Sequence, residues 1–335
     1  MTKSLAIAVR GAGVVGLWQA LMLARRGHAV TLYERSARPF ADCCSVYAGA
    51  MLAPRCEEES AEPIVRDLGR RGIAHWRDTY SGTVANGSLV VALKRDRAEL
   101  DRFARMTGGH RRLSAAELEA LEPGLAGRAA GALFYAEEAH VAPEAALRFL
   151  LDAAIAAGAK IRFGFGGMPD GADLTVDCRG LAARDDLPTL RGVRGERIVV
   201  RSRDVRLSRP VRLLHPRFPL YAVPWGDGLY MIGATVIESE ETGPITLRSA
   251  LDLMSAAYAL DPAFAEAEIL EQGAGARPAF PDNRPRIIAR KGYIYVNGLY
   301  RHGFLLAPAL AELVVDHIET GRTHPEVFLA DRPER

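Results

Sequence analysis

The sequence predicts an α/β protein in which a βαβ dinucleotide-binding unit is combined with a second, antiparallel sheet. Three observations lead to this prediction. A glycine-rich GxGxxG motif stands between a short apolar run and a helical pattern near the N-terminus. A strand-rich region occupies residues 195–236. An apolar strand followed by a long helical stripe, residues 293–318, lies near the C-terminus.

The N-terminal unit has the order strand, glycine turn, helix. Residues 5–9 are short and apolar, as is typical of a buried parallel strand. In the motif that follows, Gly11 allows a tight turn, Gly13 lets the backbone approach a pyrophosphate, and Gly16 lets helix and strand pack closely. A helix beginning there would offer free amides to phosphate oxygens. The motif therefore predicts a dinucleotide site.

A second strand at residues 29–33 completes the unit, and Glu34 stands at its end. An acid at this place can accept hydrogen bonds from ribose hydroxyls. The motif itself does not separate FAD from NAD, but its position at the extreme N-terminus favours FAD.

Several local patterns organise the next 150 residues. A loop rich in small residues, 35–54, can bring backbone close to a ligand or can be an ordinary surface loop. A helical pattern covers residues 62–80, and "GSLVVAL" predicts a strand. Ser114 and Glu117 form a capping-box pattern before another helix. Pro143 opens a helix that Gly158 ends.

The later part of the chain supplies the second sheet and two more approaches to a cofactor. "ERIVVRS", "RLLH", "LYAVPW" and "LYMIGAT" are short strand patterns typical of an antiparallel sheet. The strand and glycine of "DLTVDCRG" predict a further contact with the cofactor. The C-terminal helix starts beside "LYRH", where its free amides would stabilise negative charge, and ends at Gly321. His302 in this segment is either structural or a chemical group.

Composition excludes several classes of protein. The 335 residues carry a net charge of +2 with no long basic block, so no nucleic-acid surface is expected. No signal peptide or membrane span is apparent, and we expect a cytoplasmic protein. The four cysteines fit no zinc pattern and no disulfide framework. We expect reduced, mostly buried thiols and no metal.

Arg277 is the only charged residue of "GAGARPAF". One interpretation is composition, because the chain is rich in arginine. The other is that this guanidinium binds an anion, since guanidinium and carboxylate form a bidentate pair.

The chain resembles the D-amino acid oxidase family of FAD flavoproteins, and within it the glycine oxidases of thiamine biosynthesis. The matching segments occur in the family's order over nearly the whole chain: "GAGVVG", Glu34, "CCSVYAGAMLAP", "HVAP", "VRGE", "YAVP" with "IGAT", "GARP" and "GLYRHGFLLAP". The family often has threonines where this chain has Cys43 and Cys44, and "GFGGMPDG" is shorter than in relatives.

The resemblance implies a Rossmann-like FAD-binding domain formed by residues 1–80, 140–185 and 275–335, with an inserted antiparallel-sheet substrate domain formed by 81–139 and 186–274. It implies that Arg277 and Tyr221 hold the substrate carboxylate and that Arg301 lies beside the amine and the flavin. No cysteine follows Cys178, so noncovalent FAD is expected. The residues expected to hold FAD are Gly11, Gly13, Val14, Val15, Gly16, Glu34, Arg35, Cys44, Ser45, Gly49, Ala50, Met51, Gly167, Leu299, Tyr300, Arg301, His302, Gly303, Phe304 and Leu305.

The implied reaction is oxidation of glycine or another small amino acid to the imine, with oxygen reduced to hydrogen peroxide. The imine would then supply thiamine thiazole biosynthesis, with a possible hand-off to thiazole synthase and a possible homo-oligomer. Three alternatives stay open at this stage: a flavin amino-acid dehydrogenase that passes electrons to a carrier, an NAD-dependent enzyme, and a cofactor-binding protein without turnover.

Overall fold

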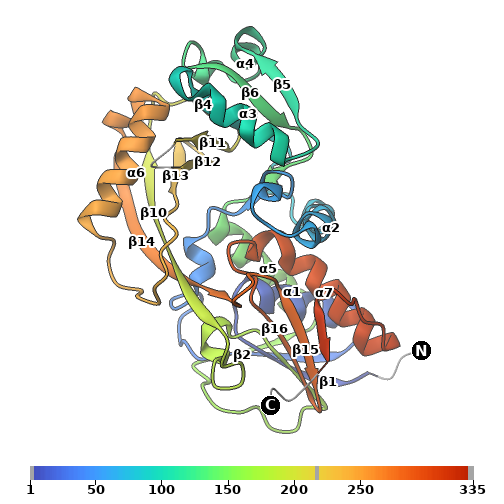
Figure 1. Ribbon diagram of the computed structural model, residues 1–335. Helices are drawn as coiled ribbons and strands as arrows, with labels where there is room; N and C mark the ends of the chain where they lie inside the picture. The colour runs from blue at the N-terminus through green and yellow to red at the C-terminus, as the bar shows by residue number, and fades with distance from the viewer. Residues whose placement is uncertain (1–3, 216–218, 331–335) are drawn as a thin grey trace.

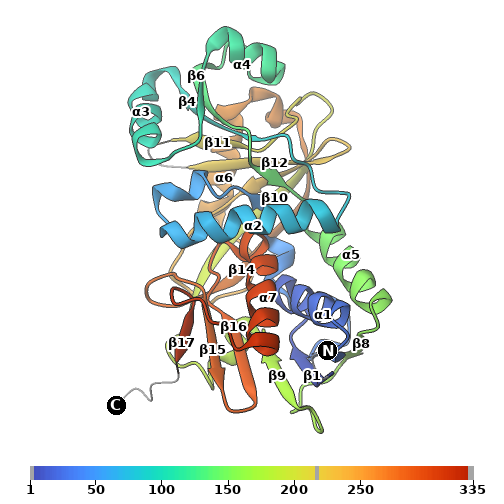
Figure 2. The same ribbon diagram turned by 90° about the vertical axis from the view of Figure 1, so that its right-hand side faces the viewer.

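The computed structural model describes residues 4–215 and 219–330. Two large sheets dominate it (Figure 1), one of seven strands and one of eight. The helix α2 (Pro63–Thr79) crosses between the upper and lower parts of the molecule (Figure 2). The predicted combination of a Rossmann-like unit with an antiparallel sheet is confirmed.

The seven-stranded sheet has the order β17-β15-β16-β9-β1-β2-β8 and is parallel except for the pair β15–β16. Its strands are β1 (Ala6–Arg10), β2 (Ala29–Glu34), β8 (Lys160–Phe163), β9 (Leu174–Asp177), β15 (Arg286–Arg290), β16 (Tyr293–Asn297) and β17 (Phe328–Ala330). The first strand lies one residue later than the sequence predicts, and the second extends to Glu34 itself. Because β1 lies between β2 and β9, the glycine turn after β1 falls at the carboxyl end of an interior strand of the sheet.

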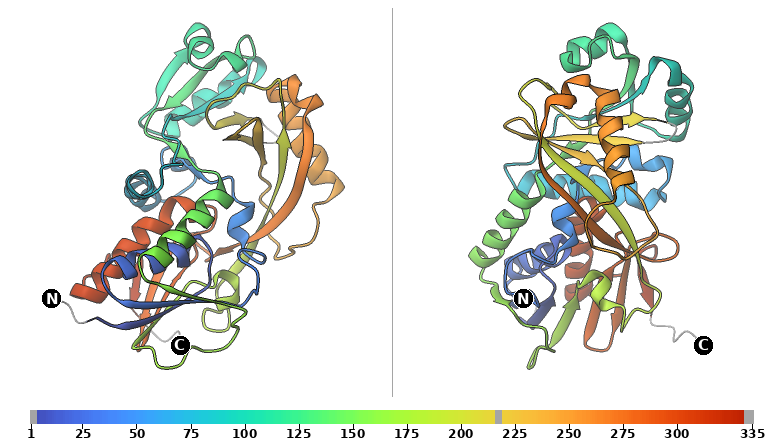
Figure 3. Two further views of the ribbon diagram at one scale, coloured as in Figure 1. Left: turned by 180° about the vertical axis from the view of Figure 1, so that it is seen from behind. Right: turned by 90° about the vertical axis from the view of Figure 1, so that its left-hand side faces the viewer.

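Three helices cover one face of this sheet: α1 (Val14–Arg25), α5 (Pro143–Ala156) and α7 (Gly303–Thr320). Figure 3 shows them between the lower sheet and the rest of the molecule. Each was predicted from apolar periodicity, and Gly321 ends α7 with φ of 73°, as its place after the stripe predicts. Their apolar faces and the sheet form the largest buried core.

The eight-stranded sheet has the order β14-β10-β13-β12-β11-β4-β6-β5 and is antiparallel except for the pair β4–β11. Its strands are β4 (Ser88–Leu93), β5 (Arg111–Ser114), β6 (Ala129–Tyr135), β10 (Arg191–Arg201), β11 (Val211–Leu214), β12 (Leu220–Gly226), β13 (Leu229–Gly233) and β14 (Glu268–Ala279). The helix α6 (Leu247–Leu260) packs on it and closes a second core.

Two small helices, α3 (Arg97–Met106) and α4 (Ala115–Leu121), accompany the β4–β6 part of this sheet. The predicted capping box is present: Ser114 and Glu117 each bond the other's backbone amide. The loop of small residues contains β3 (Met51–Leu52), which pairs antiparallel with β7 (Ala139–His140). Within the described residues, no helix is both long enough and apolar enough to cross a membrane.

Candidate active site

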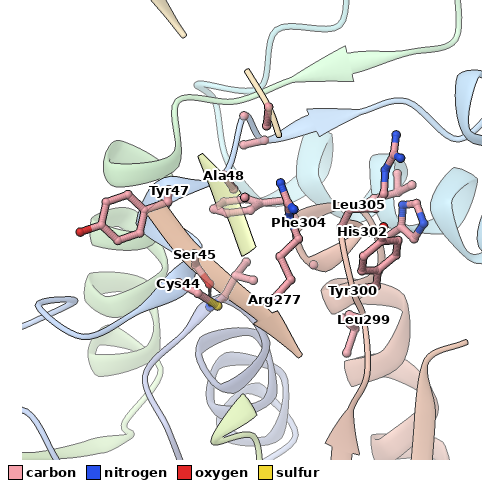
Figure 4. A pocket seen from close by; sticks show the side chains of 18 of the residues that line it. Cys44, Ser45, Tyr47, Ala48, Arg277, Leu299, Tyr300, His302, Phe304 and Leu305 are labelled. Atoms are coloured by element: carbon pink, nitrogen blue, oxygen red, sulfur yellow. Dashed lines mark hydrogen bonds between the residues drawn. The ribbon is translucent and has the colours of Figure 1, made fainter. Parts of the chain in front are cut away.

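One cavity collects backbone and side chains from both sheets and from the N-terminal ends of α1 and α7. It is lined by segments far apart in sequence: the loop before β3, the strands β10, β12, β13 and β14, and the turn that leads into α7. Figure 4 shows Arg277 in this space, with Cys44 and Ser45 on one side and Tyr300 and His302 on the other.

The glycine turn between β1 and α1 tolerates no side chains at two of its positions. A Cβ on Gly16 would lie 1.8 Å from the carbonyl oxygen of Gly11, and one on Gly11, whose φ is +95°, would lie 2.8 Å from the carbonyl oxygen of Cys178. Glu34 fixes the turn, because its carboxylate accepts hydrogen bonds from the backbone amides of Ala12 at 2.8 Å and Ser36 at 3.0 Å. Such a close-packed turn at a helix N-terminus suits a pyrophosphate.

The start of α7 offers a second group of free amides. His302 occupies the N-cap position without a side-chain cap, so the first amides of the helix have no intrahelical partner. Gly303, Phe304 and Leu305 line the cavity. Burial lowers the pKa of His302 to about 4, so this imidazole is neutral at pH 7. The partial positive charge here therefore comes from the helix end, and it favours an anionic group.

Arg277 is a half-buried cation without an acidic partner in the described part of the chain. Its Nη1 donates to the backbone carbonyls of Arg194 at 3.3 Å and Thr235 at 3.2 Å. Burial, and then the charge of Arg301, lower the pKa of this guanidinium. The position of Arg277 also requires glycine at residue 195, because a Cβ there would lie only 1.9 Å from Nη2 of Arg277. Arg277 therefore has no counter-ion among the described residues, and an anionic ligand can supply one.

Arg301 lies in a different electrostatic setting in the same cavity. Its Nη2 donates to the hydroxyl of Tyr221 at 2.7 Å and to Glu57 Oε1 at 3.1 Å. Burial alone would raise the pKa of the Glu57 carboxyl, but Arg301 first, together with His302 and Arg212, outweighs burial and holds that pKa below its usual value. Burial raises the pKa of Tyr221, which stays a neutral hydroxyl. Arg301 thus has a carboxylate partner in this cavity, whereas Arg277 has none among the described residues.

A comparison with known families settles the class of protein. A family model described as FAD dependent oxidoreductase, the DAO family, matches residues 6–317. The chain belongs to this family. The NAD alternative is therefore set aside, and the glycine turn and the two helix ends are the features of this FAD-dependent oxidoreductase that fit the cofactor.

Relatives cover nearly the whole of this FAD-dependent oxidoreductase. A Rhizobium etli protein provisionally named thiamine biosynthesis oxidoreductase ThiO is 50% identical over 327 residues, 96% of this chain and 98% of that protein. The glycine oxidase of Geobacillus kaustophilus is 26% identical over 368 residues, 96% and 95% of the two chains. A crystal structure of glycine oxidase from that organism has a TM-score of 0.81 at 24% identity, covering 96% of each chain, which shows the shared fold.

Most of the residues predicted from the sequence line the cavity of this oxidoreductase. They are Val14, Val15, Cys44, Ser45, Gly49, Ala50, Met51, Tyr221, Arg277, Leu299, Tyr300, Arg301, His302, Gly303, Phe304 and Leu305. Gly11, Gly13, Gly16 and Glu34 form the turn described above, and Arg35 is exposed just after β2. Gly167 is exposed in the loop after β8, outside the cavity lining.

One expectation about the thiols needs correction. All four cysteines are free, as predicted, and Cys56 and Cys178 are buried. Cys43 is only half-buried and Cys44 is exposed. The reason is that this pair begins a short 3₁₀ turn, Cys44–Tyr47, at the edge of the cavity and not within a core.

Two charged residues of the cavity were not predicted, Glu57 and Arg212. Glu57 belongs to the 3₁₀ turn Cys56–Glu59, whose sequence "CEEE" does not indicate which acid is buried. Arg212 lies in β11 and packs against the ring of Tyr221, 5.3 Å from its centre. The only available signal was a run of three acids shortly after the loop of small residues.

Proposed function

We propose that this FAD-dependent oxidoreductase oxidises glycine or another small amino acid to the corresponding imine and reduces oxygen to hydrogen peroxide. The observation that carries the proposal is Arg277, a half-buried guanidinium that lines the cavity and has no acidic partner in residues 4–215 and 219–330. The name of the Geobacillus relative, glycine oxidase, supports the same substrate class.

In this proposal the carboxylate of the substrate binds Arg277. Charge-assisted hydrogen bonds of this kind contribute about 1.5–3 kcal/mol each. Tyr221 completes the carboxylate site, and its hydroxyl is oriented by the bond from Arg301. With the carboxylate fixed, the amine lies towards Arg301, and a site lined by guanidinium groups favours the neutral amine over the ammonium form.

The cofactor would be held by the glycine turn, by Glu34 and by the amides at the starts of α1 and α7. FAD, when bound, supplies the acceptor for the hydride that leaves the substrate Cα. The protein contributes orientation, because a substrate clamped at its carboxylate presents Cα in a fixed place. We expect FAD to be noncovalent, since no cysteine follows Cys178.

The wider role is proposed from the name of the Rhizobium relative. The imine would supply thiazole formation in thiamine biosynthesis, the pathway in that relative's name. A hand-off to thiazole synthase and a homo-oligomer stay predictions. The cytoplasmic location stays a prediction. We also propose the division into an FAD domain and an inserted substrate domain at the boundaries given above, although β14 crosses the boundary at residue 275.

The test is an anaerobic absorbance spectrum of the purified protein before and after glycine is added. Loss of the oxidised flavin band supports the proposal. A flavin band that glycine leaves untouched overturns glycine as substrate, and sarcosine and D-alanine would be tried next. Peroxide formed in air in proportion to the glycine consumed supports the oxidase. Bleaching by glycine without peroxide in air would instead favour the dehydrogenase that uses another electron carrier.

Arg277→Met tests the carboxylate site directly. We expect kcat/KM for glycine to fall by about 10²–10³-fold, because the truncated partner of a buried charge pair costs about 2–5 kcal/mol. Arg248→Met removes the same charge from the exposed face of α6 and is the matched control. Equal activity of the two variants would show that Arg277 does not hold the carboxylate.

A further inference from the structure

Three guanidinium groups line the cavity: those of Arg212, Arg277 and Arg301. Two of them have a carboxylate partner, and both partners come from the turn Cys56–Glu59. Glu57 Oε1 lies 3.1 Å from Arg301, and Glu59 pairs with Arg212. Arg277 alone of the three is bonded only to backbone carbonyls in the part of the chain that the structure describes. The turn Cys56–Glu59 therefore determines which of the three guanidinium groups can still pair with an anionic ligand.

We propose that Glu57 is a specificity-determining residue, an internal carboxylate that occupies Arg301 and so restricts the site to amino acids with a single carboxylate. This inference rests on the proposed function. An amino acid that carries a second carboxylate on its amine, such as iminodiacetate, would have to place that group against Arg301. Glu57 already holds this position.

The electrostatics support exclusion of a second anion. Glu57 is 9% exposed and is ionised, because the neighbouring arginines outweigh the effect of its burial. A second carboxylate at Arg301 would share one guanidinium with the ionised Glu57 carboxylate, and the repulsion between these two like charges would weaken its binding. Glu57 Oε2 is buried and accepts no hydrogen bond among the described residues, and the Nδ1 atom of His302 lies 3.6 Å from it.

The position of Glu57 is also fixed by hydrogen bonds to the backbone just before it. The buried carboxylate of Glu138 accepts hydrogen bonds from the backbone amides of Arg55 at 2.9 Å and Cys56 at 2.8 Å. Glu138 is fully buried and is further bonded by Ser88. Displacement of Glu57 would therefore disturb a buried network and not a free loop.

The first experiment compares two substrates of similar size, iminodiacetate and N-propylglycine, on the FAD-loaded protein. We expect wild type to prefer N-propylglycine in kcat/KM. Glu57→Gln keeps the shape but removes the charge, and we expect it to shift the ratio towards iminodiacetate by at least about tenfold, or about 1.4 kcal/mol. Glu58→Gln removes a charge one residue away, from a side chain that pairs with Arg55 and Arg66, and should leave the ratio within about twofold. An equal loss for both substrates in Glu57→Gln would overturn the proposal.

A second experiment needs neither turnover nor a folded variant. Propoxyacetate and oxydiacetate are ether analogues of the two substrates, and their dissociation constants for the wild-type protein are measured by calorimetry. We expect oxydiacetate to bind at least about tenfold more weakly. Equal or tighter binding of oxydiacetate would refute the role of Glu57, even if Glu57→Gln does not fold. If wild type oxidises no amino acid, the proposed function fails, while these binding constants still decide the inference about Glu57.

Discussion

Gly195 in β10 leaves the space that the guanidinium of Arg277 occupies, and a substitution at Gly195 removes that space while Arg277 itself stays unchanged. In Gly195→Ala the new Cβ would lie 1.9 Å from Nη2 and 2.2 Å from Cζ of Arg277, whereas ordinary contact begins near 3.4 Å. The guanidinium must therefore move by about 1.5 Å, a shift that also breaks its bonds to the carbonyls of Arg194 and Thr235. Because the displaced group is the end of a flexible side chain and not backbone, the fold should survive.

A misplacement of about 1 Å in a group that positions substrate costs about 10²-fold in rate. We therefore expect kcat/KM for glycine to fall about 10²-fold in Gly195→Ala, or about 2.7 kcal/mol, with the flavin spectrum and thermal midpoint nearly unchanged. Steady-state peroxide formation at several glycine concentrations measures this. Gly243→Ala, where a Cβ would meet nothing within 4 Å, is the matched control. Wild-type kcat/KM in Gly195→Ala would refute the reasoning that Arg277 must hold its present place.

Three further outcomes are expected. Tyr221→Phe removes the hydroxyl that accepts from Arg301 and should lower kcat/KM for glycine by roughly tenfold with FAD retained, whereas unchanged kinetics would exclude that hydroxyl from the carboxylate site. Gly16→Ala places a Cβ 1.8 Å from a backbone oxygen and should yield protein without the yellow flavin band, while Gly166→Ala, with nothing within 4 Å, should stay yellow. Burial raises the pKa of Glu138 from 4.5 to about 7, so the folded state holds this proton more tightly than the unfolded state. The stability that this protonation contributes is complete below pH 4.5 and is lost as pH rises to about 7. Relative to Glu138→Gln, the free energy of unfolding of wild type should fall by about 3 kcal/mol over that window in urea titrations. Parallel pH profiles of the two proteins would contradict the assignment.

Local signals were sufficient where a residue's role depends on its neighbours in sequence. The glycine turn, the capping box at Ser114 and the stop at Gly321 each follow from backbone geometry that only certain residues adopt, and each is present. The cavity, by contrast, brings together groups that are separated by most of the chain. Glu57 and Arg301 are 244 positions apart, and nothing within "CEEE" marks the second residue as the buried one.

The sequence by itself determined the class of fold and the place of the nucleotide turn, because strand and helix periodicity and glycine spacing are properties of short segments. It also singled out Arg277, but left open whether composition or an anion explains it. Only the tertiary structure shows where Arg277 lies and which charged groups surround it. The strand β14 pairs with β10 from Ala279 to Glu268, and this pairing places Arg277 beside Gly195 in the cavity. Long-range pairing then compensates Arg301 and Arg212 with glutamates and leaves Arg277 without one in residues 4–215 and 219–330, a charge balance that arises from contacts between distant segments.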